Sequence, residues 1–204
     1  MKKSAYKRAL CALFSVFLVL TMVFPGEVAL AASAPGNVAR FSMTGCSAST
    51  VSLSWSKVKG ASGYRIRRYD SKSKKWKTVL TATKGSAIKG TAKKLSPATT
   101  YKLQIHAYKK AGKKTLYSKK AKTLTVATKP AKVTLQSAKA SGAKITVSWK
   151  KGAASGYQVI YARNKQFKSG ESILVRGSNK AATYYAPYSG TYYVHLRPYK
   201  NLNG

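Results

Sequence analysis

The most constraining feature of this chain of 204 residues is an internal repeat. The segment Val51–Trp55 returns as Ile145–Trp149, and Tyr101–Tyr108 returns as Tyr192–Tyr199. The offset between the copies falls only from 94 to 91 residues along the chain. A period of about 90 residues is longer than the roughly 20 to 50 residues of a solenoid unit. The repeat therefore predicts two independently folding modules in tandem.

Alternation of apolar and polar residues predicts what each module contains. Val51, Leu53 and Trp55 alternate with two serines, as in a half-buried strand. About seven short strands in about 90 residues predict an antiparallel β-sandwich, because two half-buried sheets must cover each other. We therefore expect an all-β chain with modules at residues 35–128 and 130–204. The other stretches with a period of two in the first copy are Val38–Met43, Tyr64–Tyr69, Lys77–Thr81, Ala87–Thr91, Tyr101–Tyr108 and Ala121–Val126.

The second copy is shorter than the first. The first continues 20 residues past Tyr108 to Thr128, whereas the chain continues 5 residues past Tyr199. We expect the second module to lack its last strand. The strand before it then has an unpaired edge, which predicts self-association through this module.

Residues 1–34 are typical of a secretory signal peptide. Met1–Arg8 carries four basic residues, and the apolar run Ala9–Phe24 precedes small residues that permit cleavage after Ala31 or Ala34. The run of 16 residues is shorter than the roughly 20 residues that span a bilayer. We expect a secreted protein with no membrane segment after cleavage, located outside the cell and associated with the cell wall.

One cysteine, Cys46, remains after cleavage, so no intramolecular disulfide can form. Either it is a small buried apolar residue or it forms an intermolecular disulfide. Stability must otherwise come from the two packed cores.

Several motifs, in the same order in both copies, resemble fibronectin type III modules. Trp55 and Trp149 occupy the place of that family's core tryptophan, and the two Gly-Tyr pairs resemble its third strand. Leu95–Tyr101 resembles the family's tyrosine corner, whose phenol hydroxyl bonds upstream backbone. The lysine-rich version is most similar to modules in exported proteins of Gram-positive bacteria. The resemblance implies a structural core of Trp55, Tyr64, Leu95, Tyr101, Trp149, Tyr157 and Tyr192.

Charge suggests a partner. The chain has 39 basic and 3 acidic residues, and cleavage leaves 35 and 2, a net charge of about +33. Such a surface attracts polyanions in a salt-dependent way. On an exported protein these are anionic cell-wall polymers or extracellular glycans; the alternative is that the lysines only solvate the surface. The densest basic turn offers Lys109, Lys110, Lys113 and Lys114 as polyanion contacts.

Catalytic chemistry has little support in the sequence. The two acids outside the signal, Asp70 and Glu171, fall in different modules, and both are interpreted as turn residues. His106 and His195 are expected on the outward faces of equivalent strands, without spaced metal ligands. We predict no enzyme, no cofactor, no metal site and no dedicated nucleic-acid interface.

Tyrosines leave one further question open. Tyr69, Tyr108, Tyr193 and Tyr199 are expected on outward phases of their strands. Their rings either stack on sugars or pack across strands beneath lysine stems.

Two functions remain open at this point. In the first, the modules are non-catalytic spacers or adhesive units at the cell surface that hold wall polyanions by charge. In the second, the chain is the N-terminal part of a larger enzyme or carbohydrate-binding protein that acts on the cell wall. A sandwich fold alone does not choose between them.

Overall fold

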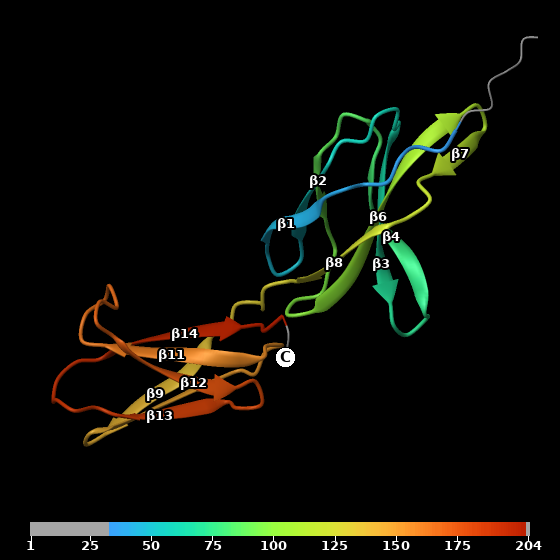
Figure 1. Ribbon diagram of the computed structural model, residues 1–204. Helices are drawn as coiled ribbons and strands as arrows, with labels where there is room; N and C mark the ends of the chain where they lie inside the picture. The colour runs from blue at the N-terminus through green and yellow to red at the C-terminus, as the bar shows by residue number, and fades with distance from the viewer. Residues whose placement is uncertain (1–32, 203–204) are drawn as a thin grey trace, which may run out of the picture. The chain divides into compact units, whose positions relative to one another are not determined.

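A computed structural model describes residues 33–202 of the chain (Figure 1). The predicted signal peptide, with its cleavage sites after Ala31 or Ala34, lies almost wholly outside the described residues. Within residues 33–202 no helix is long and apolar enough to span a membrane. Every strand pairing is antiparallel, as expected for an all-β chain of two sandwiches.

The first sandwich consists of a smaller sheet and a larger one (Figure 1). The smaller sheet has the order β1-β2-β5, and the larger has the order β4-β3-β6-β7, with β8 also paired to β6. The smaller sheet contains β1 (Phe41–Cys46), β2 (Val51–Trp55) and β5 (Lys89–Ala92). The larger contains β3 (Gly63–Asp70), β4 (Lys75–Ala82), β6 (Thr100–Ala111), β7 (Lys114–Tyr117) and β8 (Lys122–Ala127).

The inner faces of these two sheets form a continuous apolar core. Alternation in β2 buries Val51, Leu53 and Trp55 and leaves the two serines half-exposed. Tyr64, Leu95 and Tyr101 belong to the same buried cluster. Cys46 is half-buried, packs against this cluster and is a free thiol.

Two tyrosine hydroxyls fix loops around the first core. The Ser96 amide donates to Oη of Tyr101 at 2.7 Å, which is the backbone bond of a tyrosine corner. The Val58 amide donates to Oη of Tyr64 at 2.8 Å, and this hydroxyl donates to the Gly85 carbonyl at 3.2 Å. Each tyrosine thus buries its apolar ring in the core while its hydroxyl keeps a hydrogen bond to backbone.

The second sandwich has two sheets of three strands, in the orders β13-β10-β9 and β12-β11-β14. Its buried cluster includes Trp149 and Tyr157, and the Tyr157 hydroxyl bonds both the amide and the carbonyl of Gly152 at 2.9 and 3.0 Å. The strands are β9 (Leu135–Ser141), β10 (Lys144–Trp149), β11 (Gly156–Ala162), β12 (Glu171–Arg176), β13 (Ala181–Tyr185) and β14 (Tyr193–Tyr199).

Strand β14 has one neighbour, β11, among the described residues. The Ser155 amide donates to the Tyr199 carbonyl at 2.9 Å, so Tyr199 directs its carbonyl toward β11. Because backbone groups alternate in direction along an antiparallel strand, Val194, Leu196 and Pro198 direct theirs toward the free edge. Pro198 has no N–H to offer there.

Two details of the first sandwich differ from the sequence prediction. The first strand begins at Phe41 rather than Val38 and extends to Cys46, with an irregular register between Met43 and Gly45. Strand β7 was not predicted, because its four residues, Lys114–Tyr117, are too few to display a period of two.

Tyr108 lies on the outer face of its sheet, as predicted, yet it is only 4% exposed. The phenol lies over Gly63, where an added Cβ would be 2.5 Å from its Oη. Tyr199 covers Gly156 in the same way, with its Cζ 2.5 Å from an added Cβ. The glycine of each Gly-Tyr pair therefore makes room for a tyrosine on the neighbouring strand.

Tyr192 does not follow its counterpart Tyr101. It packs against the second core but is only half-buried, and among residues 33–202 its hydroxyl forms no corner bond. The reason is the altered corner: Ala186 and Tyr188 stand where the first copy has Leu95 and Pro97.

Candidate functional site

The outer face of the larger sheet in the first sandwich brings basic side chains together. Along β3, Ile66 points into the core, so Arg65 and Arg67 on either side of it lie on the outer face. On β6, Ile105 is fully buried and His106 takes the outer face. The pairing of β3 with β6 sets Arg65 directly opposite His106.

These residues line a small hollow, which we call the arginine cleft. It has a volume of about 150 Å³ and is lined by Arg65, Arg67, His106 and Tyr117. Tyr117 comes from β7, where it pairs with Tyr108 of β6. Strand β3 and the β6–β7 hairpin, which are distant in sequence, therefore meet at one site.

Neighbouring groups hold each member of the cleft in place. Cζ of Arg65 lies 4.9 Å from the ring centroid of Tyr117, a cation–π contact. Nδ1 of His106 donates to the Ser118 carbonyl at 3.0 Å. With the Gln104 amide turned so that its oxygen faces Arg67, that oxygen accepts from Nε at 3.1 Å and from Nη2 at 2.8 Å. The cleft is thus ordered before any ligand arrives.

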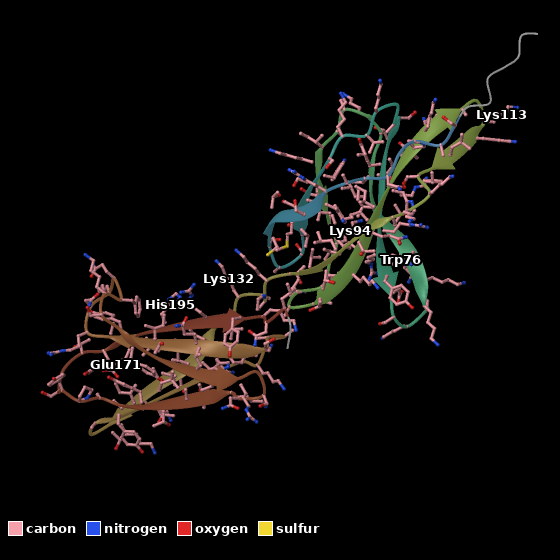
Figure 2. All side chains as sticks on the ribbon, viewed as in Figure 1. Trp76, Lys94, Lys113, Lys132, Glu171 and His195 are labelled. Carbon is pink, nitrogen blue, oxygen red and sulfur yellow. The ribbon has the colours of Figure 1, made fainter. Side chains whose placement is uncertain are left out.

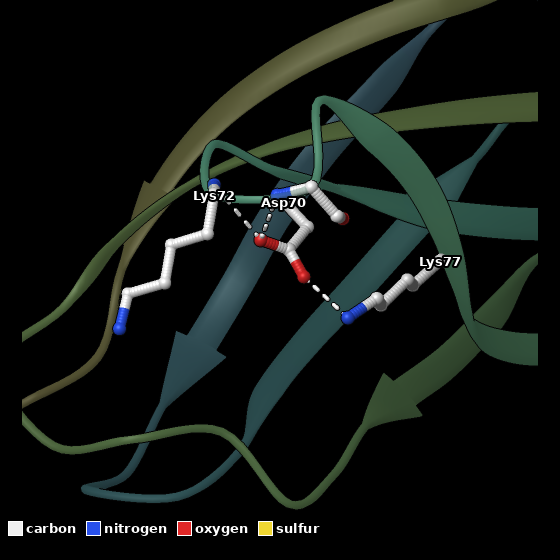
Figure 3. Close-up of polar contacts among 4 residues, drawn as sticks. Asp70, Lys72 and Lys77 are labelled. Carbon is white, nitrogen blue, oxygen red and sulfur yellow. Dashed lines mark hydrogen bonds and ion pairs between the residues drawn. The ribbon is translucent and has the colours of Figure 1, made fainter.

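No carboxylate neutralises the cleft within residues 33–202. The ion pair of this region joins Lys77 to Asp70, at the turn between β3 and β4 (Figure 3). Asp70 also accepts from the amides of Lys72 and Ser73, at 3.1 and 3.3 Å, as its predicted turn role requires. The hydrogen bond from Lys77, aided by these amides, holds the Asp70 pKa well below its usual value. Asp70 is therefore paired with Lys77 and not with Arg65 or Arg67.

This chemistry suits an oxyanion. Guanidinium groups donate in a planar fork that matches carboxylate, phosphate or sulfate oxygens. Two such groups on one strand face, with no acid beside them, can contact neighbouring oxyanions of a polymer. The same surface offers no carboxylate pair for general acid–base chemistry.

The four lysines predicted as polyanion contacts lie on the β6–β7 hairpin. Lys110 falls on the outer face with His106, whereas Lys109 falls on the opposite face and is half-buried. Lys113 and Lys114 are exposed, and Lys113 projects from the hairpin tip (Figure 2). The structure therefore brings Lys110 alone of the four onto the face of the arginine cleft.

The remaining titratable candidates are dispersed. Glu171 does not serve as a turn residue, contrary to the prediction: it begins β12 and accepts a hydrogen bond from the Tyr184 hydroxyl. His195 is exposed on β14, as predicted, 5.4 Å from the ring of Phe167. In the described part of the chain no three His, Cys, Asp or Glu side chains form a group that could hold a metal ion.

The other outward tyrosines are only partly accessible. Tyr69 is 37% exposed and packs against Trp76 across the β3–β4 pair, with ring centroids 5.3 Å apart. Tyr193 is half-buried beneath Lys165, whose Nζ lies 5.9 Å from the ring centroid. Tyrosines packed beneath basic stems are thus present in both sandwiches.

Sequence reasoning missed Arg65, Arg67 and Tyr117. The arginine pair carried a usable signal, because two cations at alternate positions of a predicted strand must share its outer face. Tyr117 carried no such signal, since its place depends on the unpredicted strand β7.

A family model and several solved structures are similar to parts of this chain. The family model "Fibronectin type III domain" matches residues 33–123, the first sandwich. A two-domain fibronectin type III segment of chicken tenascin is 19% identical and covers 83% of this chain and 93% of its own, with a TM-score of 0.49. The FN1–FN3 domains of chicken CNTN1 are 18% identical and cover 82% of this chain and 60% of their own, with a TM-score of 0.37. No curated protein gives a significant sequence match.

Proposed function

We propose that this protein is an exported, non-catalytic binding module. The proposal starts from the match of residues 33–123 to the fibronectin type III domain. Domains of this type are generally spacers or adhesive units rather than enzymes. The sequence of residues 1–34 supports export, and the anions available outside a cell include acidic cell-wall polymers. The partner we propose is such an anionic polymer at the cell surface.

The observation that carries this proposal is the uncompensated positive charge of the arginine cleft. Arg65 and Arg67 lie on one strand face, and within residues 33–202 no carboxylate pairs with them. A polymer with regularly spaced oxyanions gains contacts to both guanidinium groups and is attracted over a longer range by the lysines. Affinity then comes from many weak contacts and falls with salt.

Chromatography on purified anionic cell wall or a heparin-like resin tests the proposal. The chain without its predicted signal peptide should bind at low ionic strength and elute well below 1 M sodium chloride, where the screening length is about 3 Å. A protein that passes through at low salt contradicts polyanion binding. Retention at 1 M salt contradicts an electrostatic mechanism.

A charge-matched pair of variants tests the cleft itself. Arg65→Gln with Arg67→Gln removes two charges from the cleft, and Lys139→Gln with Lys144→Gln removes two exposed charges from the second sandwich. We expect the arginine variant to elute at clearly lower salt than the lysine variant. Equal shifts would mean that net charge alone, and not the cleft, determines retention.

A further inference from the structure

A second hollow lies in the second sandwich and takes no part in the proposed polyanion binding. It has a volume of about 120 Å³ and opens beside the loop between β13 and β14. The lining residues that matter here are Tyr161, Arg163, Glu171, Tyr184, Tyr188 and Tyr192. We call it the tyrosine hollow.

Four tyrosines are among the residues that line it. Tyr161 and Tyr184 are stacked, with centroids 4.5 Å apart and an interplanar angle of 15°. Tyr192 lies 6.0 Å from Tyr184, and Tyr188 is 67% exposed at the rim. The exposed rim ring offers a flat apolar face to a bound molecule.

Polar groups of both kinds accompany these rings. Arg163 supplies donors, with its Cζ 5.9 Å from the Tyr188 centroid, and Glu171 supplies acceptor oxygens. The Tyr161 side chain is only 1% exposed, and its hydroxyl has no hydrogen-bond partner in the described part of the chain. Burial raises the pKa of Tyr161 to about 12, so this hydroxyl remains a donor at neutral pH. A buried phenol without a partner calls for an explanation.

We propose that the tyrosine hollow binds an uncharged pyranose residue of a glycan. A pyranose combines apolar C–H faces, which suit tyrosine rings, with hydroxyls that both donate and accept. Arg163 and Glu171 both line the hollow, so their opposite charges offset each other and no net charge favours an ionic ligand there. The hollow therefore selects a neutral hydroxylated ring within a strongly basic protein.

A neighbouring hollow indicates how a longer glycan would continue. It has a volume of about 270 Å³ and shares Pro187, Tyr188 and Tyr192 with the tyrosine hollow. An oligosaccharide seated in the first hollow therefore places its next residue across Tyr188. Binding of this kind rests on stacking and hydrogen bonds, so it can fail or succeed independently of the charge-based function proposed above.

Calorimetric titration of the chain without its predicted signal peptide tests the proposal in 1 M sodium chloride, where diffuse attraction is screened. The probes are the uncharged oligosaccharides chitotetraose and cellotetraose. We expect at least one to bind with a Kd of about 1 mM or tighter. Absence of heat with both probes at that concentration overturns the proposal, whatever the behaviour on anionic resin.

Two variants and a matched control locate the site. Tyr188→Ala should weaken binding about tenfold. Tyr185→Ala should leave it unchanged, because Tyr185 is 69% exposed on the opposite face of β13 and does not line the hollow. Tyr161→Phe should weaken binding without lowering the melting temperature, because its hydroxyl has no protein partner to lose. Equal effects of Tyr188→Ala and Tyr185→Ala would overturn the assignment to this hollow.

Discussion

Strand β6 of the first sandwich and strand β14 of the second occupy equivalent places in the repeat but have different neighbours. β6 lies between β3 on one side and β7 and β8 on the other, whereas β14 pairs with β11 alone among the described residues. Leu103 and Ile105 of β6 are completely buried, and their counterparts Val194 and Leu196 are half-buried. The same sequence pattern thus gives a smaller core where the described residues supply a neighbour on one side of the strand only.

Local motifs are kept in both sandwiches although their surroundings differ. Both Gly-Tyr pairs keep a tyrosine over the glycine, and both third-strand tyrosines bond upstream backbone through their hydroxyls. These contacts involve strands present in both sandwiches. The tyrosine corner, in contrast, is found in the first sandwich alone among residues 33–202.

The largest expected effect distinguishes the two cores. Trp55→Ala should cost about 3 to 5 kcal/mol of unfolding free energy through a cavity, with cooperative unfolding retained. Trp149→Ala removes a fully buried ring from the smaller cluster and should abolish cooperative unfolding of the second sandwich. Denaturant titration with NMR signals from each sandwich measures both. Equal, small losses would contradict the assignment of these indoles to the cores.

A glycine replacement tests what the two sandwiches share. Gly63→Ala should cost about 1 to 3 kcal/mol, because its Cβ would overlap Tyr108 and the Ala82 carbonyl. Gly156→Ala should cost a similar amount through Tyr199. Gly45→Ala is the control, since its Cβ would meet nothing within 4 Å. Thermal melts in which all three variants behave alike would show that the tyrosines yield freely.

Amide exchange tests the free edge directly. The Ser118 amide bonds the Ala107 carbonyl at 2.9 Å, so alternate amides of β6, including Leu103 and Ile105, face β8. We expect the amides of Val194 and Leu196 to exchange at least about tenfold faster than these two. Slow exchange at Val194 would mean that another strand covers this edge.

The tyrosine corner gives a smaller difference. Tyr101→Phe should cost about 1 kcal/mol, because the Ser96 amide loses its acceptor. Tyr192→Phe should cost close to nothing, since no corner bond exists there in the described chain. Denaturant titration of the two variants measures the difference between their unfolding free energies. A comparable loss for Tyr192→Phe would indicate a corner bond in solution.

The smallest effect concerns the turn at Asp70. Its pKa is lowered in the folded state, so the ionised carboxylate favours folding above its ordinary pKa of about 3.9, and this contribution is lost as the pH falls. Because its partner Lys77 is exposed and solvent screens the ion pair, Asp70→Asn should lower the melting temperature at pH 7 by less than Tyr101→Phe does. The two proteins should converge in acid. A difference that grows below pH 4 would contradict this sign.

How far the sequence predicts the structure depends on the range of the interaction. Strand β2 and the corner at Tyr101 follow from local alternation and a short motif, so they could be recognised. The arginine cleft and the tyrosine hollow could not, because each depends on cross-strand register. Arg65 meets His106 only through pairing of distant strands, and Glu171 reaches Tyr184 from an adjacent sheet.

Pro198 has a consequence for any chain that adds to β14. In the first sandwich, the carbonyl of its counterpart Ala107 accepts a hydrogen bond from the Ser118 amide. Proline has no backbone N–H. A strand that docks on this edge of β14 therefore finds amide donors at Val194 and Leu196 and none at Pro198. A ladder this short forms and separates readily. Where this edge of β14 is uncovered, we therefore expect Pro198 to restrict edge pairing to short, reversible ladders.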